Sequence, residues 1–96
     1  LMEFGVPREV RDRERRVGLE PAGVLSLTRA GHSVYIQHDA GDEAGFSDEE
    51  YREAGGQIVY SADEAYGRAD VVVKVARPTS EAYELFQPGQ TIFSFL

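Results

Sequence analysis

The chain has 96 residues, the length of one domain with one modest core. Apolar residues make up 42% and charged residues 28%, which are ordinary globular values and exclude a disordered chain. A net charge of −7 argues against a nucleic-acid-binding face, which would be basic, and the absence of cysteine excludes disulfides and thiolate chemistry.

The sequence shows neither an apolar run of membrane-spanning length nor a signal peptide. Together with the lack of cysteine, this predicts a cytoplasmic protein with no membrane segment. Met2 looks like a natural start, and residues 91–96 form an apolar, strand-like run where chains more often finish in a polar tail. We therefore expect these residues to be the first part of a longer protein.

The first third of the chain predicts a strand, a loop, a helix and a second strand. Residues 3–6 read as a short strand, and residues 8–16 as a charged loop with five arginines and three acids. A helix is expected to begin at Pro21 and to end at Gly31, followed by a strand over residues 33–37.

The acidic, glycine-rich segment 39–45 looks most like a ligand-binding loop, but its spacing does not fit one. Its acids miss the alternate positions of a calcium loop, and its glycines lack the nucleotide-binding spacings. Its negative charge would also repel phosphate. We interpret it as a structural turn.

Three more helices and three more strands are predicted in the second half. Two of the helices begin with a Ser-x-x-Glu capping box, at Ser47 and Ser61. The expected helices cover residues 47–55, 61–67 and 78–86, and the expected strands residues 57–60, 70–74 and 91–95. Alternation of five strands with four helical segments predicts one α/β unit over residues 1–96: a mostly parallel five-stranded sheet with helices on both faces, Rossmann-like or flavodoxin-like and incomplete.

The candidate site centres on Lys74, which ends a strand with three consecutive valines. Burying an unpaired lysine is costly, so Lys74 either reaches water at the strand end or serves a site. Ligands of parallel sheets bind beyond the carboxyl ends of the strands, where Lys74 and the loop with Arg16 both lie. We expect Lys74 and Arg16 to form an anion site; the alternative for the arginine loop is solubility alone.

The remaining polar candidates carry weaker expectations. His38 follows a strand beside Asp39, with nothing else converging on it, and His32 follows a helix end, which favours a structural role. Glu9 is expected to pair with a basic residue of its own loop. The five tyrosines are expected to be packing residues.

Several segments together resemble the alanine dehydrogenase and pyridine nucleotide transhydrogenase family. Residues 5–9 and 14–21 match its signature G-[IV]-P-[KR]-E followed by E-x-R-V-[AG]-L-x-P. Matching segments follow in the same order at residues 31–34, 41–48 and 70–75, and Pro88-Gly89-Gln90 also matches.

The resemblance implies the N-terminal part of the substrate domain of an NAD-dependent alanine dehydrogenase, which converts L-alanine to pyruvate and ammonia. The positions that bind the keto acid in that family match Arg16 and Lys74. Arginine can hold the carboxylate in its fork, and Lys74 is also the catalytic candidate because an ammonium can polarise the carbonyl. NAD is bound in the family by a separate Rossmann domain, so this segment alone is not expected to be active. Family members usually form homo-oligomers.

Two departures leave alternatives open. The family commonly reads Lys-Val-Lys-Glu-Pro where this chain has Lys74-Val75-Ala76-Arg77-Pro78, and Arg15 replaces a small polar residue. The alternatives are a transhydrogenase α subunit, a divergent amino-acid dehydrogenase of the same family, and a non-enzymatic α/β module that binds a small anion or mediates assembly. The sequence leaves the choice between NAD and NADP open.

Overall fold

A computed structural model describes residues 1–11 and 13–95. Asp12, one of the acids of the predicted charged loop, and Leu96, the last residue of the predicted apolar run, lie outside the described residues. Within the described part, no helix is long and apolar enough to cross a membrane.

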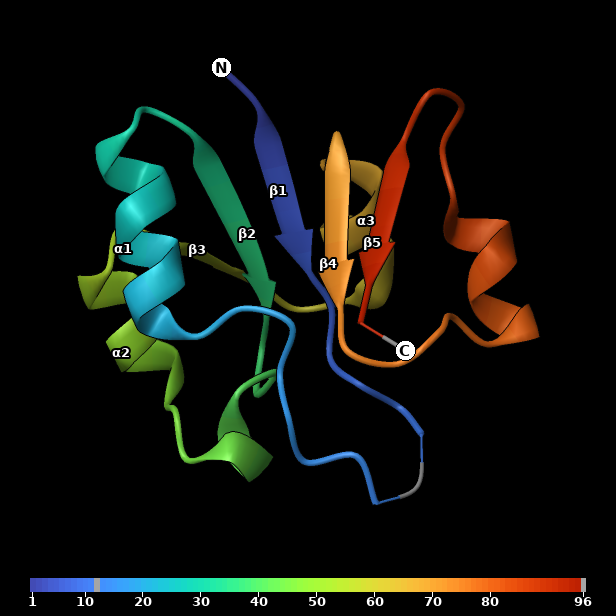
Figure 1. Cartoon of the computed structure of the whole chain (residues 1–96), viewed down its shortest axis with the longest axis horizontal. Helices are drawn as coiled ribbons and strands as arrows, with labels where there is room; N and C mark the ends of the chain where they lie inside the picture. Colours follow the sequence, from blue (N-terminus) through green and yellow to red (C-terminus); the bar gives the residue numbers. More distant parts are fainter. Residues whose placement is uncertain (12, 96) are drawn as a thin grey trace.

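Five strands form one parallel sheet in the order β3-β2-β1-β4-β5 (Figure 1). This order is the Rossmann arrangement and differs from the flavodoxin one, so it decides between the two predicted possibilities. The strands are β1 (Glu3–Val6), β2 (Ser33–Gln37), β3 (Gln57–Val59), β4 (Val71–Lys74) and β5 (Thr91–Ser94).

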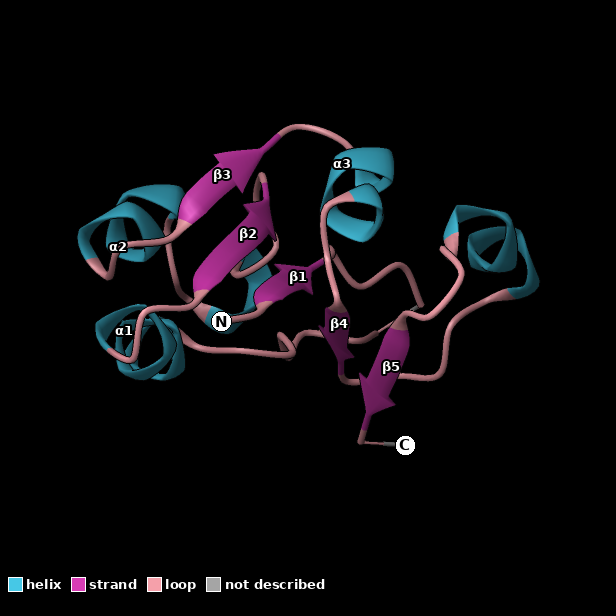
Figure 2. Cartoon of the chain, turned by 90° about the horizontal axis from the view of Figure 1, so that it is seen from above, coloured by secondary structure: helices cyan, strands magenta, loops and turns pink. Residues whose placement is uncertain are grey.

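Helices cover both faces of the sheet, as predicted, with α1 and α3 on opposite sides (Figure 2). Helices α1 and α2 share one apolar cluster with the sheet, and α3 shares another with the 3₁₀ helix η2. The helical elements are α1 (Pro21–Arg29), α2 (Asp48–Glu53), α3 (Ala62–Gly67) and the 3₁₀ helices η1 (Asp42–Ala44) and η2 (Ser80–Leu85).

The helix ends follow the predicted local chemistry. Pro21 is the first residue of α1, and Gly31 after its end has φ +95°, the left-handed conformation that favours glycine. Ser47 and Glu50 form the complete capping box that starts α2. Ser61 caps α3 by accepting from the Glu64 amide at 3.1 Å.

The strands over residues 3–6 and 33–37 have the predicted bounds, and the other predicted elements are somewhat longer than the observed ones. The expected helix over residues 78–86 is only the six-residue η2, and the loop over residues 39–45 contains the single turn η1, in keeping with a structural turn. Short segments of this kind owe their form to the contacts around them rather than to helix propensity, so their limits are not visible in the sequence.

Side-chain alternation builds the two faces of the core. Val34 and Ile36 of β2 point toward the cluster of α1 and α2, while Tyr35 between them points toward α3. Helix α3 packs directly on β1, because a Cβ atom at Gly5 would lie 2.2 Å from the Ala65 carbonyl oxygen. Because α3 follows β3 in a parallel sheet, its start lies at the carboxyl edge of that sheet.

Candidate functional site

Two loops leave the carboxyl edge of the sheet side by side. Strands β1 and β4 are paired, with Gly5 opposite Val72, so the loop after Val6 emerges beside Lys74. A cavity of 540 Å³ lies between these loops and is also lined by the starts of α3 and η2. Its position matches the edge at which parallel sheets bind ligands.

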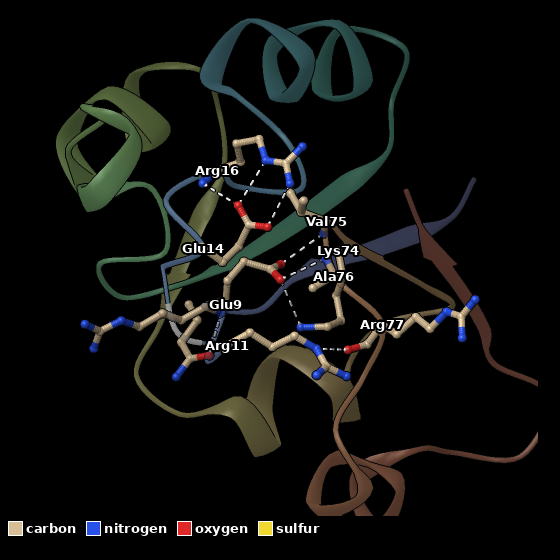
Figure 3. A network of polar contacts seen from close by, with 10 residues as sticks. Glu9, Arg11, Glu14, Arg16, Lys74, Val75, Ala76 and Arg77 are labelled. Atoms are coloured by element: carbon tan, nitrogen blue, oxygen red, sulfur yellow. Dashed lines mark hydrogen bonds and ion pairs between the residues drawn. The ribbon is translucent and has the colours of Figure 1, made fainter. Parts of the chain in front are cut away.

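Lys74 is the single lysine of the chain. The other basic residues are arginines and two histidines. It is only 4% exposed, although it lines the cavity. Its Nζ atom lies 3.5 Å from Oε1 of Glu9 (Figure 3). Lys74 is therefore neither a strand-end lysine reaching into water nor an unpaired buried charge.

Glu9 pairs with Lys74 and also holds the end of β4 in place. Its carboxylate accepts hydrogen bonds from the amides of Val75 at 3.1 Å and Ala76 at 3.2 Å, and its side chain is 3% exposed. Two amide donors and one ammonium satisfy the buried carboxylate, as a buried ion pair requires. The expectation that Glu9 pairs within its own loop is wrong, because residue 74 lies beside it only after the sheet has formed.

The rest of the charged loop is also fixed to β4. The Arg11 Nε atom donates to the Arg77 carbonyl oxygen at 3.0 Å. Where the loop returns to the core, Gly18 passes close to β4. A Cβ atom on Gly18 would lie 2.3 Å from the Val73 carbonyl oxygen. The loop is therefore anchored at both ends around the cavity.

Arg16 lies on the outer side of this loop and pairs with Glu14. Its Nε and Nη2 atoms donate to the two Glu14 carboxylate oxygens at 3.0 and 2.9 Å, and its side chain is 64% exposed. The Arg16 guanidinium and backbone amide lower the pKa of Glu14 by hydrogen bonding, and Glu14 in turn raises the pKa of Arg16. The loop thus presents Arg16 with its fork already occupied by a carboxylate.

Arg16 and Lys74 line two adjoining cavities and not one. The second cavity, of 350 Å³, is lined by the five arginines of the charged loop, and it shares Arg8, Glu9 and Val10 with the first. Among the described residues, no hydrogen bond or ion pair joins Arg16 to Lys74. The structure brings the two predicted site residues to the same loop system, on either side of Glu9 (Figure 3).

Tyr66 lines the first cavity together with Lys74, a place that the sequence did not reveal; this cavity is called the Lys74 cavity below. It is 2% exposed and its ring stacks on Phe86 at 5.7 Å between centroids, so the expectation of a packing role holds for the ring. Burial, followed by the negative charge of Glu9, raises its pKa from 10.0 to about 12. The hydroxyl therefore stays protonated near neutral pH.

His38 has more partners than its sequence neighbours suggest. Its Nδ1 atom lies 2.5 Å from Oδ2 of Asp48, and its Nε2 atom lies 3.3 Å from Oδ2 of Asp39. The expectation that nothing else converges on His38 is wrong. Partial burial opposes ionisation of Asp48, but hydrogen bonds from the Asp39 amide and the His38 ring lower its pKa overall. This cluster follows β2 and lies outside the lining of the Lys74 cavity.

Comparisons with known proteins find matches over nearly the whole chain. A family model described as "Alanine dehydrogenase/PNT, N-terminal domain" matches residues 5–96. The alanine dehydrogenase of Methanococcus maripaludis is 42% identical over 95 residues, which are 99% of this chain and 26% of that protein. The chain therefore spans about a quarter of the length of the curated relatives it matches.

Two solved structures share the fold. An L-alanine dehydrogenase superposes with a TM-score of 0.94 at 47% identity, over 97% of this chain and 26% of that one. A transhydrogenase from Sinorhizobium meliloti superposes with a TM-score of 0.90 at 26% identity, over 98% of this chain and 27% of that one.

Proposed function

The chain belongs to the family of alanine dehydrogenase/PNT N-terminal domains, and we propose that it is the N-terminal segment of the substrate domain of an NAD-dependent alanine dehydrogenase. One observation carries this proposal: a single lysine, buried at the carboxyl edge of a parallel sheet, is held by Glu9 on the wall of an open cavity. A cation placed in this way can receive an oxygen of a small acid such as pyruvate.

Lys74 and Arg16 would divide the work on such a ligand. The Lys74 ammonium would hold the carbonyl oxygen and stabilise the negative charge that develops there during the reaction. Arg16 would hold the carboxylate in its fork. The guanidinium must first exchange its hydrogen bonds to Glu14 for hydrogen bonds to the ligand. Because Arg16 is mostly exposed, this exchange does not require the core to move.

The residues described do not fit NAD itself. The loop after β1, where a dinucleotide-binding sheet has its glycine-rich turn, carries arginines and glutamates instead. NAD would therefore be bound by another part of a longer protein, in keeping with the fraction of the relatives that this chain spans. The proposal places that longer protein in the cytoplasm as a homo-oligomer, with this segment contributing the binding of L-alanine and pyruvate.

The second candidate function is that of a transhydrogenase α subunit, which the Sinorhizobium meliloti structure supports. The dehydrogenase is favoured because the solved L-alanine dehydrogenase is 47% identical to this chain and the transhydrogenase is 26% identical. The two functions differ in the requirement for an amino acid, so the substrate separates them.

A chimera tests the proposal. In the Methanococcus maripaludis alanine dehydrogenase, this chain replaces the 95 aligned residues, and pyruvate reduction with ammonium and NADH is followed by the loss of NADH absorbance. We expect activity with pyruvate within about tenfold of the parent enzyme. A folded chimera that does not turn over pyruvate would contradict the proposal. Loss of pyruvate turnover with NADH binding retained would favour the transhydrogenase, whose reaction needs no amino acid.

A further inference from the structure

The hydroxyl of Tyr66 has no visible structural role. Tyr66 as a whole is only 2% exposed, and its hydroxyl has no hydrogen-bond partner among the residues that the structure describes. A hydroxyl without a partner in the protein adds nothing to the packing of the ring, and phenylalanine would fill the same space. Packing against Phe86 therefore explains the ring and leaves the hydroxyl unexplained.

The course of α3 directs this hydroxyl toward the Lys74 cavity. The helix begins at the carboxyl edge of the sheet, after β3, and ends at the amino edge, before β4. Helical side chains lean toward the start of their helix, so Tyr66 points back toward the level of Ala62, one turn earlier on the same face. Ala62 and Tyr66 both line the cavity.

The hydroxyl also remains open to a ligand. In the described part of the chain, every side-chain nitrogen or oxygen that is sealed from the surface has a hydrogen-bond partner. The Tyr66 hydroxyl has none, so it is not sealed, and the cavity that Tyr66 lines is where it can meet a ligand. The raised pKa keeps this group a donor at all ordinary pH values.

We propose that the Tyr66 hydroxyl donates a hydrogen bond to an oxygen of the acid bound beside Lys74 and thereby helps to select that ligand. The inference rests on the proposed function and deepens it, because it adds a neutral hydrogen-bond donor to the site of Lys74 and Arg16. A 2-keto acid offers acceptor oxygens on its carboxylate and its carbonyl, and a neutral donor recognises them without adding charge beside Glu9.

Tyr66→Phe in the chimera tests the inference. Loss of one hydrogen bond to a charged acceptor predicts a rise in the KM for pyruvate of about 10- to 100-fold. The KM for NADH and the thermal midpoint should stay near those of the unsubstituted chimera, because the ring still packs on Phe86. Tyr83→Phe is the matched control: Tyr83 also contacts the Phe86 ring, edge to face, but is 61% exposed and does not line the cavity, so the KM values of this variant should not change.

The outcomes separate this inference from the proposed function. An active chimera whose KM for pyruvate is unchanged by Tyr66→Phe would overturn the role of Tyr66 and leave the proposed function standing. A folded chimera without activity on pyruvate would overturn both. An equal rise in KM for Tyr66→Phe and Tyr83→Phe would assign the effect to the packing of Phe86 and would also overturn the inference.

Discussion

The two candidate cations of this edge are each paired with a glutamate of the same loop, but in opposite environments. Lys74 and Glu9 are 5% and 3% exposed, whereas Arg16 is 64% exposed and its partner Glu14 is 9% exposed. The first pair is locked by two backbone amides that directly follow β4, and the second is confined to its own loop. Burial thus fixes one cation before a ligand arrives and leaves the other able to move.

This difference has an energetic consequence. The buried pair contributes to the fold, because either partner left alone would be a desolvated charge. The pair of Arg16 and Glu14 contributes less to stability, since solvent screens the exposed guanidinium and the long arginine side chain loses freedom in forming the pair. The proposed site thus combines a preorganised ammonium with a guanidinium that is free to move toward a ligand.

The largest expected effect comes from breaking the buried pair. Lys74→Ala leaves the Glu9 carboxylate buried without its counter-charge, and we expect a loss of about 3–5 kcal/mol in the free energy of unfolding. Urea unfolding of the 96-residue chain measures this loss. Glu9→Gln/Lys74→Met, which replaces the pair by neutral groups of similar shape, should recover part of it, because a glutamine oxygen replaces only one of the two oxygens that accept from the Val75 and Ala76 amides. A Lys74→Ala chain as stable as the unsubstituted one would show that the pair is not buried in solution.

A smaller effect is expected where the loop of Arg16 passes over β4. Gly18→Ala adds a Cβ atom that would lie 2.3 Å from the Val73 carbonyl oxygen, so the loop must shift. Overpacking of this kind costs about 1–3 kcal/mol. Gly67→Ala is the matched control, because a Cβ atom there meets nothing within 4 Å. Equal unfolding free energies for the two variants would contradict the close approach of loop and strand.

The smallest expected effect is on the pH dependence of stability, which should differ between the two regions. Near Lys74, the folded pKa of Tyr66 is raised from 10.0 to about 12, so its contribution is complete below pH 10 and disappears as the pH rises to about 12. Near Arg16, the folded pKa of Glu14 is lowered from 4.5, so its contribution is complete above that pH and disappears as the pH falls through the lower folded value.

Two variants separate these contributions in urea unfolding at a series of pH values. Tyr66→Phe should flatten the alkaline limb in part, since burial also raises the pKa of Tyr51, and should leave the acid limb unchanged. Glu14→Gln should flatten the acid limb alone. The account of the two regions would be wrong if each variant altered both limbs equally.

The sequence predicted the fold well because the signals for the fold are local. Apolar strands, Pro21 and the Ser47 capping box act on neighbouring residues, and the structure has these elements where they were expected. Alternation of strands and helices then restricts the sheet to a parallel one. The limits of η2 were not predicted, because they depend on packing against α3.

The site was less visible, because its contacts join residues far apart in the chain. Lys74 and Arg16 were predicted as site residues from their place at strand ends, and this stays a prediction. Glu9 and Asp48 gain their partners only when the sheet places segments side by side. Tyr66 looks like any core tyrosine in the sequence. One further signal for Lys74 lies in the composition: it is the single lysine in a chain whose other strongly basic residues are nine arginines.

The most direct test of the central claim is the kcat/KM for pyruvate of the chimera that carries Glu9→Gln/Lys74→Met, with Glu53→Gln as a control of an exposed glutamate on α2. The double substitution removes the ammonium without leaving the Glu9 charge buried and unpaired. The thermal midpoint of the same chimera shows how much of any loss comes from the one backbone amide whose hydrogen bond a glutamine nitrogen cannot accept. We predict a decrease of about 10²- to 10³-fold, the usual cost of removing one electrostatic contact to a reacting oxygen. A value within a few-fold of the unsubstituted chimera would contradict the assignment of Lys74.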